Sequence, residues 1–254
     1  MVCRIYDDFR PDFVRKVREL FPETQGPETT AIVRTATTVD ENFLISRPAL
    51  RYVLRGGSGL DNIDLAACER RGVRVFSTPG ANARAVGELA VAALVSLARG
   101  LQASDQDVRR GMWQRIRGRE IGSMTVGVIG FGHTGRAFAR ALRGFDCTVL
   151  AYDKYRPAEK PFSAALQDVF ERADAVSFHV PLTDETRHYL DASFVASMRR
   201  SFAVLNLSRG EVVDLHALLE GLRTGRIWGA HLDVLPFEPS SGAELSLSES
   251  QQRL

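Results

Sequence analysis

The stretch that decides the fold is Thr125-Val-Gly-Val-Ile-Gly130-Phe-Gly132-His-Thr-Gly135. A run rich in β-branched residues leads into glycines spaced G-x-G-x-x-G, and an amphipathic segment follows at 137–143. The first glycine permits a tight turn, the second lets the backbone approach a phosphate, and the third allows the helix to pack closely on the strand. The amide groups at the helix N-terminus attract an anion. This strand, turn and helix therefore predict a site for the pyrophosphate of a dinucleotide.

The next strand candidate, Thr148–Tyr152, ends directly before Asp153, which lies 18 residues after Gly135. A carboxylate at this distance accepts hydrogen bonds from the adenosine ribose hydroxyls and repels a 2′-phosphate. The spacing favours NAD over NADP as the cofactor, although Lys154 and Arg156 close by weaken the discrimination. The alternative interpretation of Asp153 is an ordinary turn residue at the end of a strand.

Short apolar runs alternate with helical patterns on both sides of this unit, which indicates parallel sheets with crossover helices. The fold class predicted is α/β, with a doubly wound parallel-sheet (Rossmann) domain and a smaller, incomplete flavodoxin-like α/β domain. The predicted strands are 2–6, 31–33, 52–54, 73–76, 126–129, 148–152, 175–180, 203–207 and 227–234. The predicted helices are 13–20, 65–71, 83–99, 137–143, 164–171, 192–198 and 215–222.

The domain boundary is predicted near Pro79-Gly80, with a shortened substrate domain at 1–80 and a nucleotide-binding domain at 81–240. The Ser- and Glu-rich stretch 241–254 has no periodicity and is predicted to be a poorly ordered tail. In segment 83–99, Ala, Val and Leu run almost all round the helix. This helix is therefore predicted to be buried between domains or subunits.

Composition and charge exclude several classes of function. The 254 residues include 33 basic and 31 acidic side chains, a net charge of +2, so no surface field collects nucleic acid or anionic lipid. The basic segment Arg109–Arg119 is predicted to be a solvated helix or arm, with a nucleic-acid site as the weaker alternative. The three cysteines are far apart and predict neither disulfides nor a metal site. With no targeting or membrane signal, a cytoplasmic location is expected.

Several further segments, in this order along the chain, resemble D-2-hydroxyacid dehydrogenases and especially the D-3-phosphoglycerate dehydrogenase branch. The resemblance extends from about Ile32 to Pro239. The segments are Val33-Arg-Thr-Ala-Thr37, Gly59-Leu-Asp-Asn-Ile-Asp64, Thr78-Pro-Gly-Ala-Asn-Ala-Arg-Ala-Val-Gly-Glu-Leu89, Ser177-Phe-His-Val-Pro-Leu-Thr183, Leu205-Asn-Leu-Ser-Arg-Gly210, Val212-Val-Asp214, Leu232-Asp-Val234 and Glu238-Pro239.

The resemblance implies an NAD-dependent oxidoreductase that transfers hydride between the cofactor and a 2-hydroxy or 2-keto acid. NAD would lie between the two domains, with its pyrophosphate over the turn. The implied cofactor residues are Gly130, Gly132, His133, Thr134, Gly135, Asp153, His179, Val180, Pro181, Leu207, Ser208 and Asp233. The implied substrate residues are Arg34, Thr35, Gly57, Ser58 and Asn82. A surface arginine is an equally good interpretation of Arg34.

The resemblance also implies two catalytic residues. Arg209 would be the cation that polarises the reacting carbonyl, and Glu238 would hydrogen-bond a histidine that carries the proton. The family supplies that histidine from a Thr-Pro-His segment after the Glu, whereas residues 239–254 contain none. His231 is a weak replacement, because it lies two residues before Asp233 on the same face of the strand, away from the place where the family histidine enters. Packing is its alternative role.

Activity is therefore expected to be impaired. The alternative function is an NAD(H)-binding pseudoenzyme that acts as a ligand sensor or scaffold, like corepressors related to this family. The apolar segment 83–99 indicates a dimer interface, and the resemblance implies that the basic segment after it is a dimerisation arm, so a homodimer is expected.

Overall fold

The computed structural model describes residues 2–22 and 25–237. The chain divides into two compact units between Ala81 and Asn82, where the sequence predicts a boundary near Pro79-Gly80. Unit 1 is used here for residues 2–81 and unit 2 for residues 82–237. Glu238 and the segment 241–254, for which the sequence predicts a catalytic role and a tail, lie outside the described residues.

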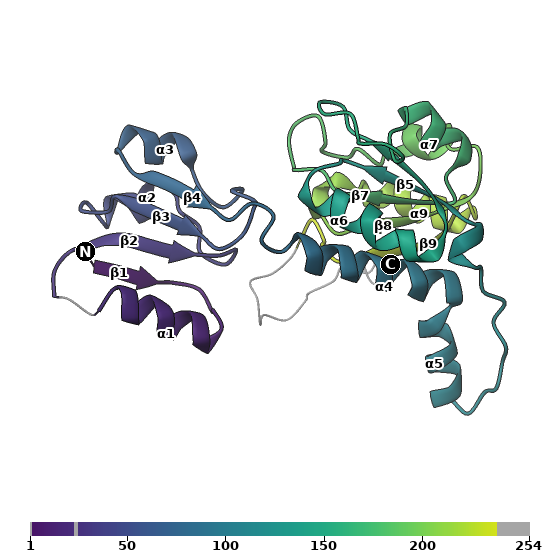
Figure 1. Cartoon of the computed structure of the whole chain (residues 1–254), viewed down its shortest axis with the longest axis horizontal. Helices are drawn as coiled ribbons and strands as arrows, with labels where there is room; N and C mark the ends of the chain where they lie inside the picture. The colour runs from purple at the N-terminus through teal and green to yellow at the C-terminus, as the bar shows by residue number, and fades with distance from the viewer. Residues whose placement is uncertain (1, 23–24, 238–254) are drawn as a thin grey trace. The chain divides into compact units, whose positions relative to one another are not determined.

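Unit 2 is a five-stranded parallel sheet with helices on both faces (Figure 1). Its strands are β5 (Thr125–Ile129), β6 (Thr148–Tyr152), β7 (Ala175–Phe178), β8 (Phe202–Asn206) and β9 (Ile227–Leu232). Its α-helices are α4 (Ala83–Arg99), α5 (Leu101–Arg109), α6 (His133–Ala141), α7 (Leu166–Arg172), α8 (Ala192–Ser197) and α9 (Leu215–Arg223), with short 3₁₀ turns at Ile121–Ser123, Leu142–Phe145 and Gly210–Val212.

The strand order in unit 2 is β6-β5-β7-β8-β9, so the direction of winding reverses at β5. Such a reversal opens a crevice at the carboxyl ends of the two strands beside it, and in open α/β sheets this crevice is where ligands bind. The glycine-rich turn follows β5 directly and lies at this point. The doubly wound architecture predicted from the sequence is confirmed.

The sheet of unit 2 is buried on both faces, which explains why its strands read as unbroken apolar runs. All four residues of β7 and all five of β8 are buried. One apolar cluster packs α4 and α6 on the sheet around Leu94 and Phe138, and a second packs α7, α8 and α9 around Phe194 and Leu218. The two clusters hold the carboxyl ends of the strands in fixed positions.

Helix α4 buries one face within its own unit. Its buried residues, among them Gly87, Ala90 and Leu94, follow helical spacing on one face, which packs on α6, β8 and β9 of its own unit. Gly87 allows this close approach, because a Cβ there would lie 3.0 Å from the backbone of Ala137. Leu89 on another face is 42% exposed. The sequence prediction that this helix is buried between domains or subunits concerns its other faces and stays a prediction.

Unit 1 is a smaller parallel sheet of four strands in the order β1-β2-β3-β4. Its strands are β1 (Val2–Ile5), β2 (Glu28–Val33), β3 (Tyr52–Arg55) and β4 (Arg74–Ser77), and its helices are α1 (Pro11–Leu20), α2 (Glu41–Ile45) and α3 (Leu65–Arg70). A flavodoxin-like sheet has the order 2-1-3-4-5. Removing its second strand leaves a linear order, which agrees with the prediction of an incomplete domain.

One apolar cluster holds unit 1 together. It joins Val33 and Val53 of the sheet to Leu44 of α2 and Ala67 of α3. Strand β4 packs against this cluster only through the half-buried Val75; it alternates between exposed and half-buried residues, and Phe76 is 49% exposed. Unit 1 therefore buries less of its sheet than unit 2 does.

Several predicted element ends are corrected by the structure. Helix α6 begins at His133, four residues before the predicted start, because the turn itself supplies the first helical residues. Strand β7 ends at Phe178 and β9 at Leu232, two residues earlier than predicted in each case. His188, outside every predicted element, lies in a turn with φ of 54°. Local sequence patterns do not reveal where ladder hydrogen bonds stop.

No single helix in the described part of the chain is long and apolar enough to cross a membrane. One bent pair, α4 with α5, passes such a test on length and composition, with an angle of 62° between the two helices. The buried face of α4 in unit 2 accounts for its apolar composition.

Candidate nucleotide and catalytic site

The predicted cofactor residues of unit 2 lie at one edge of its sheet. Each follows the carboxyl end of a strand: the glycine-rich turn follows β5, Asp153 follows β6, and His179 follows β7. Leu207 and Ser208 follow β8, and Asp233 follows β9. Because all neighbouring strands are parallel, these ends lie side by side. Residues spread over about a hundred positions are thereby brought to one edge.

The glycines after β5 meet strict steric requirements. Gly130 has φ of 91°, and a Cβ there would lie 2.5 Å from the carbonyl oxygen of His179. A Cβ on Gly135 would lie 2.1 Å from the carbonyl oxygen of Gly130. Gly132 has open space where a Cβ would be. The first and third glycines are therefore needed to form the turn, whereas Gly132 leaves the approach to the helix end unobstructed.

The N-terminus of α6 can hold a pyrophosphate. Gly132 is the N-cap residue, and having no side chain it leaves the first-turn amides of His133, Thr134 and Gly135 without a capping side chain. The first intrahelical bond runs from the Arg136 amide to the Gly132 carbonyl oxygen at 3.1 Å. Amides at a helix N-terminus, together with the helix dipole, attract anions. The residues present therefore fit the phosphates of a dinucleotide.

Asp153 is tied to the glycine turn. Its carboxylate accepts hydrogen bonds from the backbone amides of Phe131 at 2.8 Å, Tyr155 at 3.0 Å and Arg156 at 2.9 Å. Burial raises the pKa of the carboxyl, but these three donors outweigh it, so the pKa of Asp153 lies below its ordinary value. Asp153 is thus a charged acceptor whose position is fixed relative to the turn, as recognition of a ribose diol requires.

The side chain of His179 does not face the crevice. Its imidazole is 7% exposed, its ring centroid lies 5.4 Å from that of Phe138, and its Nε2 lies 2.9 Å from Ser177 Oγ. Burial lowers the pKa of His179 to about 4, so the ring is neutral. Any contact of His179 with a cofactor must come from its backbone, whose carbonyl closes over Gly130. Val180 and Pro181 continue this loop with half-buried and exposed side chains.

Asn206, which the sequence analysis did not select, organises the turn that carries Arg209. The fully buried Asn206 side chain donates to the Arg209 carbonyl oxygen at 2.8 Å and accepts from the Ser208 amide and hydroxyl at 3.2 and 2.8 Å. Its backbone oxygen accepts from the Asp233 amide at 3.0 Å. The half-buried Arg209 donates from Nη1 to the Ser208 carbonyl oxygen at 2.7 Å. The sequence signal that could have identified Asn206 is a polar residue at the end of an otherwise apolar strand.

The predicted substrate residues of unit 1 lie on two neighbouring loops. Arg34 and Thr35 follow β2 and are exposed. The Arg34 guanidinium donates to the Asp8 carbonyl oxygen at 3.1 Å. Gly57 and Ser58 follow β3, and the Ser58 hydroxyl accepts from the Gly80 amide at 3.2 Å. These loops therefore lie at the carboxyl end of the small sheet. Asn82, the fifth predicted residue, belongs to unit 2 as the N-cap of α4.

Arg55 is a second residue that the sequence analysis did not select. It ends β3 and is only 7% exposed, and a Cβ added at Gly57 would lie 1.5 Å from its Nη1. Its guanidinium therefore lies directly against the Gly57 backbone. A charged residue at the end of an apolar strand, just before a glycine-rich loop, was again the available signal.

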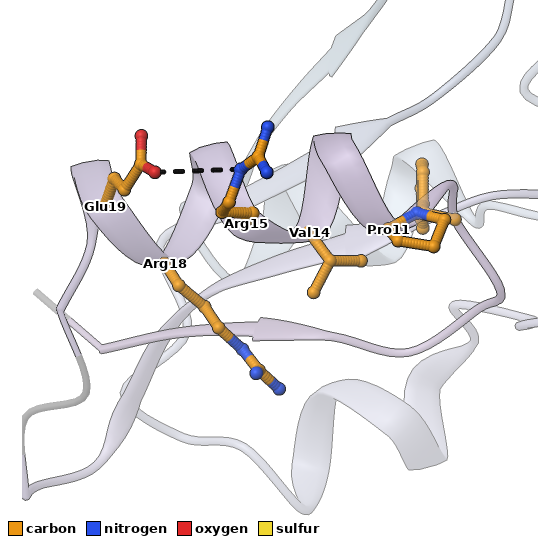
Figure 2. A pocket seen from close by; sticks show the side chains of 6 residues that line it. Pro11, Val14, Arg15, Arg18 and Glu19 are labelled. Atoms are coloured by element: carbon orange, nitrogen blue, oxygen red, sulfur yellow. Dashed lines mark ion pairs between the residues drawn. The ribbon is translucent and has the colours of Figure 1, made fainter.

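A cavity of about 560 Å³ lies along α1 in unit 1, lined by Phe9, Pro11, Val14, Arg15, Arg18 and Glu19 (Figure 2). Figure 2 shows the ion pair between Arg15 and Glu19, at 3.9 Å. None of the predicted site residues lines this cavity. It combines apolar surface with exposed charge and has no titratable pair suited to catalysis.

Two predicted features concern proton transfer. Glu238 lies outside the described residues. His231 on β9 is half-buried, and its Nε2 has no hydrogen-bond partner among the described residues. In the part of the chain that the structure describes, no three His, Cys, Asp or Glu side chains form a group able to hold a metal ion.

Comparison with known proteins supports this architecture. The family described as D-isomer specific 2-hydroxyacid dehydrogenase, NAD binding domain, matches residues 91–251. Hydroxypyruvate reductase from Thermotoga maritima is 34% identical over 212 residues, which are 82% of this chain and 69% of the relative. D-3-phosphoglycerate dehydrogenase from Mycobacterium bovis is 37% identical over 227 residues, which are 86% of this chain. The chain spans only 43% of that second relative.

Among solved structures, D-lactate dehydrogenase from Aquifex aeolicus, complexed with NAD and lactic acid, is similar to this chain. The TM-score is 0.73 at 27% identity, with 81% of this chain and 64% of that chain covered. The similarity extends beyond unit 2, since unit 2 makes up less than 81% of the chain.

Proposed function

Because the chain belongs to the D-isomer specific 2-hydroxyacid dehydrogenase family, we propose that it is an NAD-dependent oxidoreductase that acts on a 2-hydroxy or 2-keto acid. Unit 2 is assigned the cofactor, and the loops of unit 1 are assigned the substrate together with Arg209 and Asn82 of unit 2. The observation that carries the proposal is the gathering of the glycine turn, Asp153 and the Arg209 turn at one edge of a parallel sheet. An edge with this composition accommodates the phosphates, the ribose and the reacting end of a dinucleotide.

NAD is favoured over NADP because of Asp153. Its carboxylate is charged and fixed by three backbone donors, so it accepts hydrogen bonds from a ribose diol and repels a 2′-phosphate. When bound, NAD accepts or supplies the hydride. The chain's own residues orient it: the amides of His133 and Thr134 bind its phosphates, and Leu207, Ser208 and Asp233 border its nicotinamide end.

Arg209 is assigned the role of binding the substrate. A guanidinium binds a carboxylate with two parallel hydrogen bonds and also stabilises the negative charge that develops on a reacting carbonyl oxygen. The Asn206 network holds the backbone from which Arg209 projects. In the family pattern Glu238 would support a proton-carrying histidine further along the chain, which residues 239–254 do not contain, so slow turnover is expected.

Nucleotide titration tests the cofactor assignment. Binding of NADH and NADPH is measured by nicotinamide fluorescence for the parent chain, for Asp153→Ala and for Glu171→Ala, an exposed acid on α7, as the control. The parent is expected to bind NADH more tightly than NADPH. Asp153→Ala is expected to weaken NADH binding and to narrow the difference between the affinities for NADH and NADPH, while Glu171→Ala changes neither affinity. Equal affinity for both nucleotides in the parent would contradict the assignment.

Turnover separates an oxidoreductase from the pseudoenzyme alternative. NADH oxidation is followed with glyoxylate, pyruvate, hydroxypyruvate and phosphohydroxypyruvate, for the parent and for Arg209→Lys. An oxidoreductase shows turnover with at least one acid, reduced by at least about 10²-fold in the variant, the typical loss for one stabilising donor. NADH binding without turnover on any acid would favour a ligand-sensing role.

We also propose that the chain forms a homodimer through α5 and the arm after it. Apolar side chains are exposed along this segment, and Trp113 is 81% exposed. The others are Leu101, Val108, Met112 and Ile116. A run of exposed apolar residues on an extended arm indicates a protein interface, and a second copy is the commonest partner.

Light scattering measures the mass in solution. The parent is expected to be a dimer and Trp113→Glu a monomer, whereas Leu20→Glu, at an apolar residue of α1 that is 75% exposed, leaves the mass unchanged. A monomeric parent would contradict the dimer proposal without affecting the cofactor site.

A further inference from the structure

Two loops flank the glycine turn, and a polar contact joins them. In the sheet order, β6 and β7 are the two neighbours of β5. The loop after β6 carries Asp153, Lys154 and Tyr155, and the loop after β7 carries Glu185. Side chains from the two loops therefore meet beside the position assigned to the adenosine ribose.

The contact centres on one carboxylate oxygen. Glu185 Oε2 accepts a hydrogen bond from Lys154 Nζ at 2.8 Å and another from the Tyr155 hydroxyl at 2.5 Å. The Lys154 ammonium also lies 5.4 Å from the centre of the Tyr155 ring. Lys154, and after it Tyr155, hold the pKa of the Glu185 carboxyl below its ordinary value. Glu185 is therefore charged near neutrality and draws the ammonium group toward the β7 loop.

The charges explain why this contact matters for the cofactor. Lys154 directly follows Asp153, and a cation near the ribose acid is the kind of group that accommodates a 2′-phosphate. Bound to Glu185, the ammonium is neutralised and held in place. A 2′-phosphate would then face the Asp153 carboxylate, while the nearest lysine is already paired with Glu185. A free ribose diol, being uncharged, suffers no such repulsion.

From this geometry we propose that Glu185 is a specificity-determining residue, which favours a dinucleotide with a free ribose 2′-hydroxyl by holding Lys154 away from the 2′ position. The inference rests on the proposed function, because it presumes that unit 2 binds a nicotinamide dinucleotide. It assigns part of the discrimination to a loop on the opposite side of the glycine turn from Asp153.

The test compares dissociation constants of NADH and NADPH in Glu185→Gln, which keeps the size and an acceptor oxygen but removes the charge. The matched control is Glu220→Gln, since Glu220 makes an exposed ion pair of the same kind with Arg223 on α9 at 2.7 Å. Lys154→Gln and the double variant complete a cycle that isolates the pair. Thermal melting verifies that all variants are folded.

The ratio of the NADPH to the NADH dissociation constant is expected to fall about two- to fivefold in Glu185→Gln, the range that an exposed ion pair supports. The effect should be larger at about 0.01 M than at about 1 M ionic strength, because salt screens exposed charges. The double variant should not show this fall in the ratio, because the lysine freed from Glu185 is what produces it. Glu220→Gln should leave the ratio as in the parent.

An unchanged ratio in Glu185→Gln at low salt, with NADH still bound, overturns this inference alone. A fall in the ratio that persists in the double variant overturns it too, because Lys154 would then not be the group involved. If the parent chain binds neither nucleotide, the proposed function itself is wrong and this inference fails with it.

Discussion

Unit 2 and unit 1 are both parallel α/β sheets, but they bury their strands to different extents. In unit 2 every residue of β7 and β8 is buried between two apolar clusters. Unit 1 has one cluster, and its strand β4 has no buried residue. A sheet covered on both faces loses more contacts when it opens, so we expect unit 2 to be the more stable unit. Unit 2 also carries the predicted cofactor residues.

The largest expected effect comes from matched core leucines, Leu94 in unit 2 and Leu44 in unit 1, each at most 1% exposed. Changing either to alanine is expected to lower the free energy of unfolding of its own unit by about 2–5 kcal/mol. Hydrogen exchange locates the loss. Leu44→Ala should speed exchange in unit 1 alone and leave NADH affinity unchanged. Loss of NADH binding in Leu44→Ala would show that the units do not fold independently.

Lowering the pH is expected to have the next largest effect on the free energy of unfolding. The histidine contribution falls on unit 2 alone, because residues 1–81 contain no histidine. Burial lowers the pKa of His179 from 6.5 to about 4, so the folded state binds its proton less readily than the unfolded state. This contribution, about 3 kcal/mol in full, is present above pH 6.5 and is lost as the pH falls toward 4. Urea unfolding at several pH values measures it.

The variant His179→Gln should remove this part of the pH dependence. His216→Gln, at an exposed histidine of α9, should preserve it. If the free energy of unfolding of the parent varies between pH 6.5 and 4 in the same way as that of His179→Gln, the assignment of a buried neutral ring is contradicted.

The glycine turn gives the third effect. In Gly135→Ala the added Cβ would meet the Gly130 carbonyl oxygen, so the turn must open, at a cost of about 1–3 kcal/mol. Because the cofactor needs the closed turn, this cost lowers NADH affinity by a factor on the order of 10–100. Gly144→Ala is the control, because a Cβ there meets no atom within 4 Å. Unaltered NADH binding in Gly135→Ala would remove the turn from the site.

The smallest expected effect compares two helix caps. Asp64 accepts from the Ala67 amide at 2.9 Å at the start of α3 in unit 1, and Asp191 accepts from the Phe194 amide at 2.8 Å at the start of α8 in unit 2. Each change to alanine should cost about 0.5–2 kcal/mol. Chemical denaturation should show the Asp64→Ala loss in the transition of unit 1. A shared transition for both variants would contradict separate unfolding of the units.

The sequence predicts most of the fold, because apolar strands and glycine turns are local signals. Strand β6 and helix α4 have the predicted bounds, and the glycine turn connects β5 to α6 as expected. The short helix α2 was not predicted. Its five residues are too few for periodicity, and it depends on the Asp40 cap and on burial of Leu44.

The candidate site was predicted less completely than the fold. Positions at strand ends followed from the glycine pattern and from the family resemblance, but the direction of a side chain did not. His179 illustrates this, since its ring turns inward to Ser177. Asn206 and Arg55 were missed because their importance depends on contacts with a neighbouring loop or strand end, which no local pattern records. The contact between Lys154 and Glu185 spans 31 positions and is invisible in the same way.

The measurement that tests the central claim most directly is hydrogen exchange of the intact chain with and without saturating NADH. The account predicts slower exchange at the first-turn amides of α6, residues 133–135, and at residues 153–156, with unit 1 strands β1 and β2 unaffected. These amides are where the phosphates and the ribose are assigned. Unchanged exchange at the start of α6 in the presence of bound NADH would contradict the account.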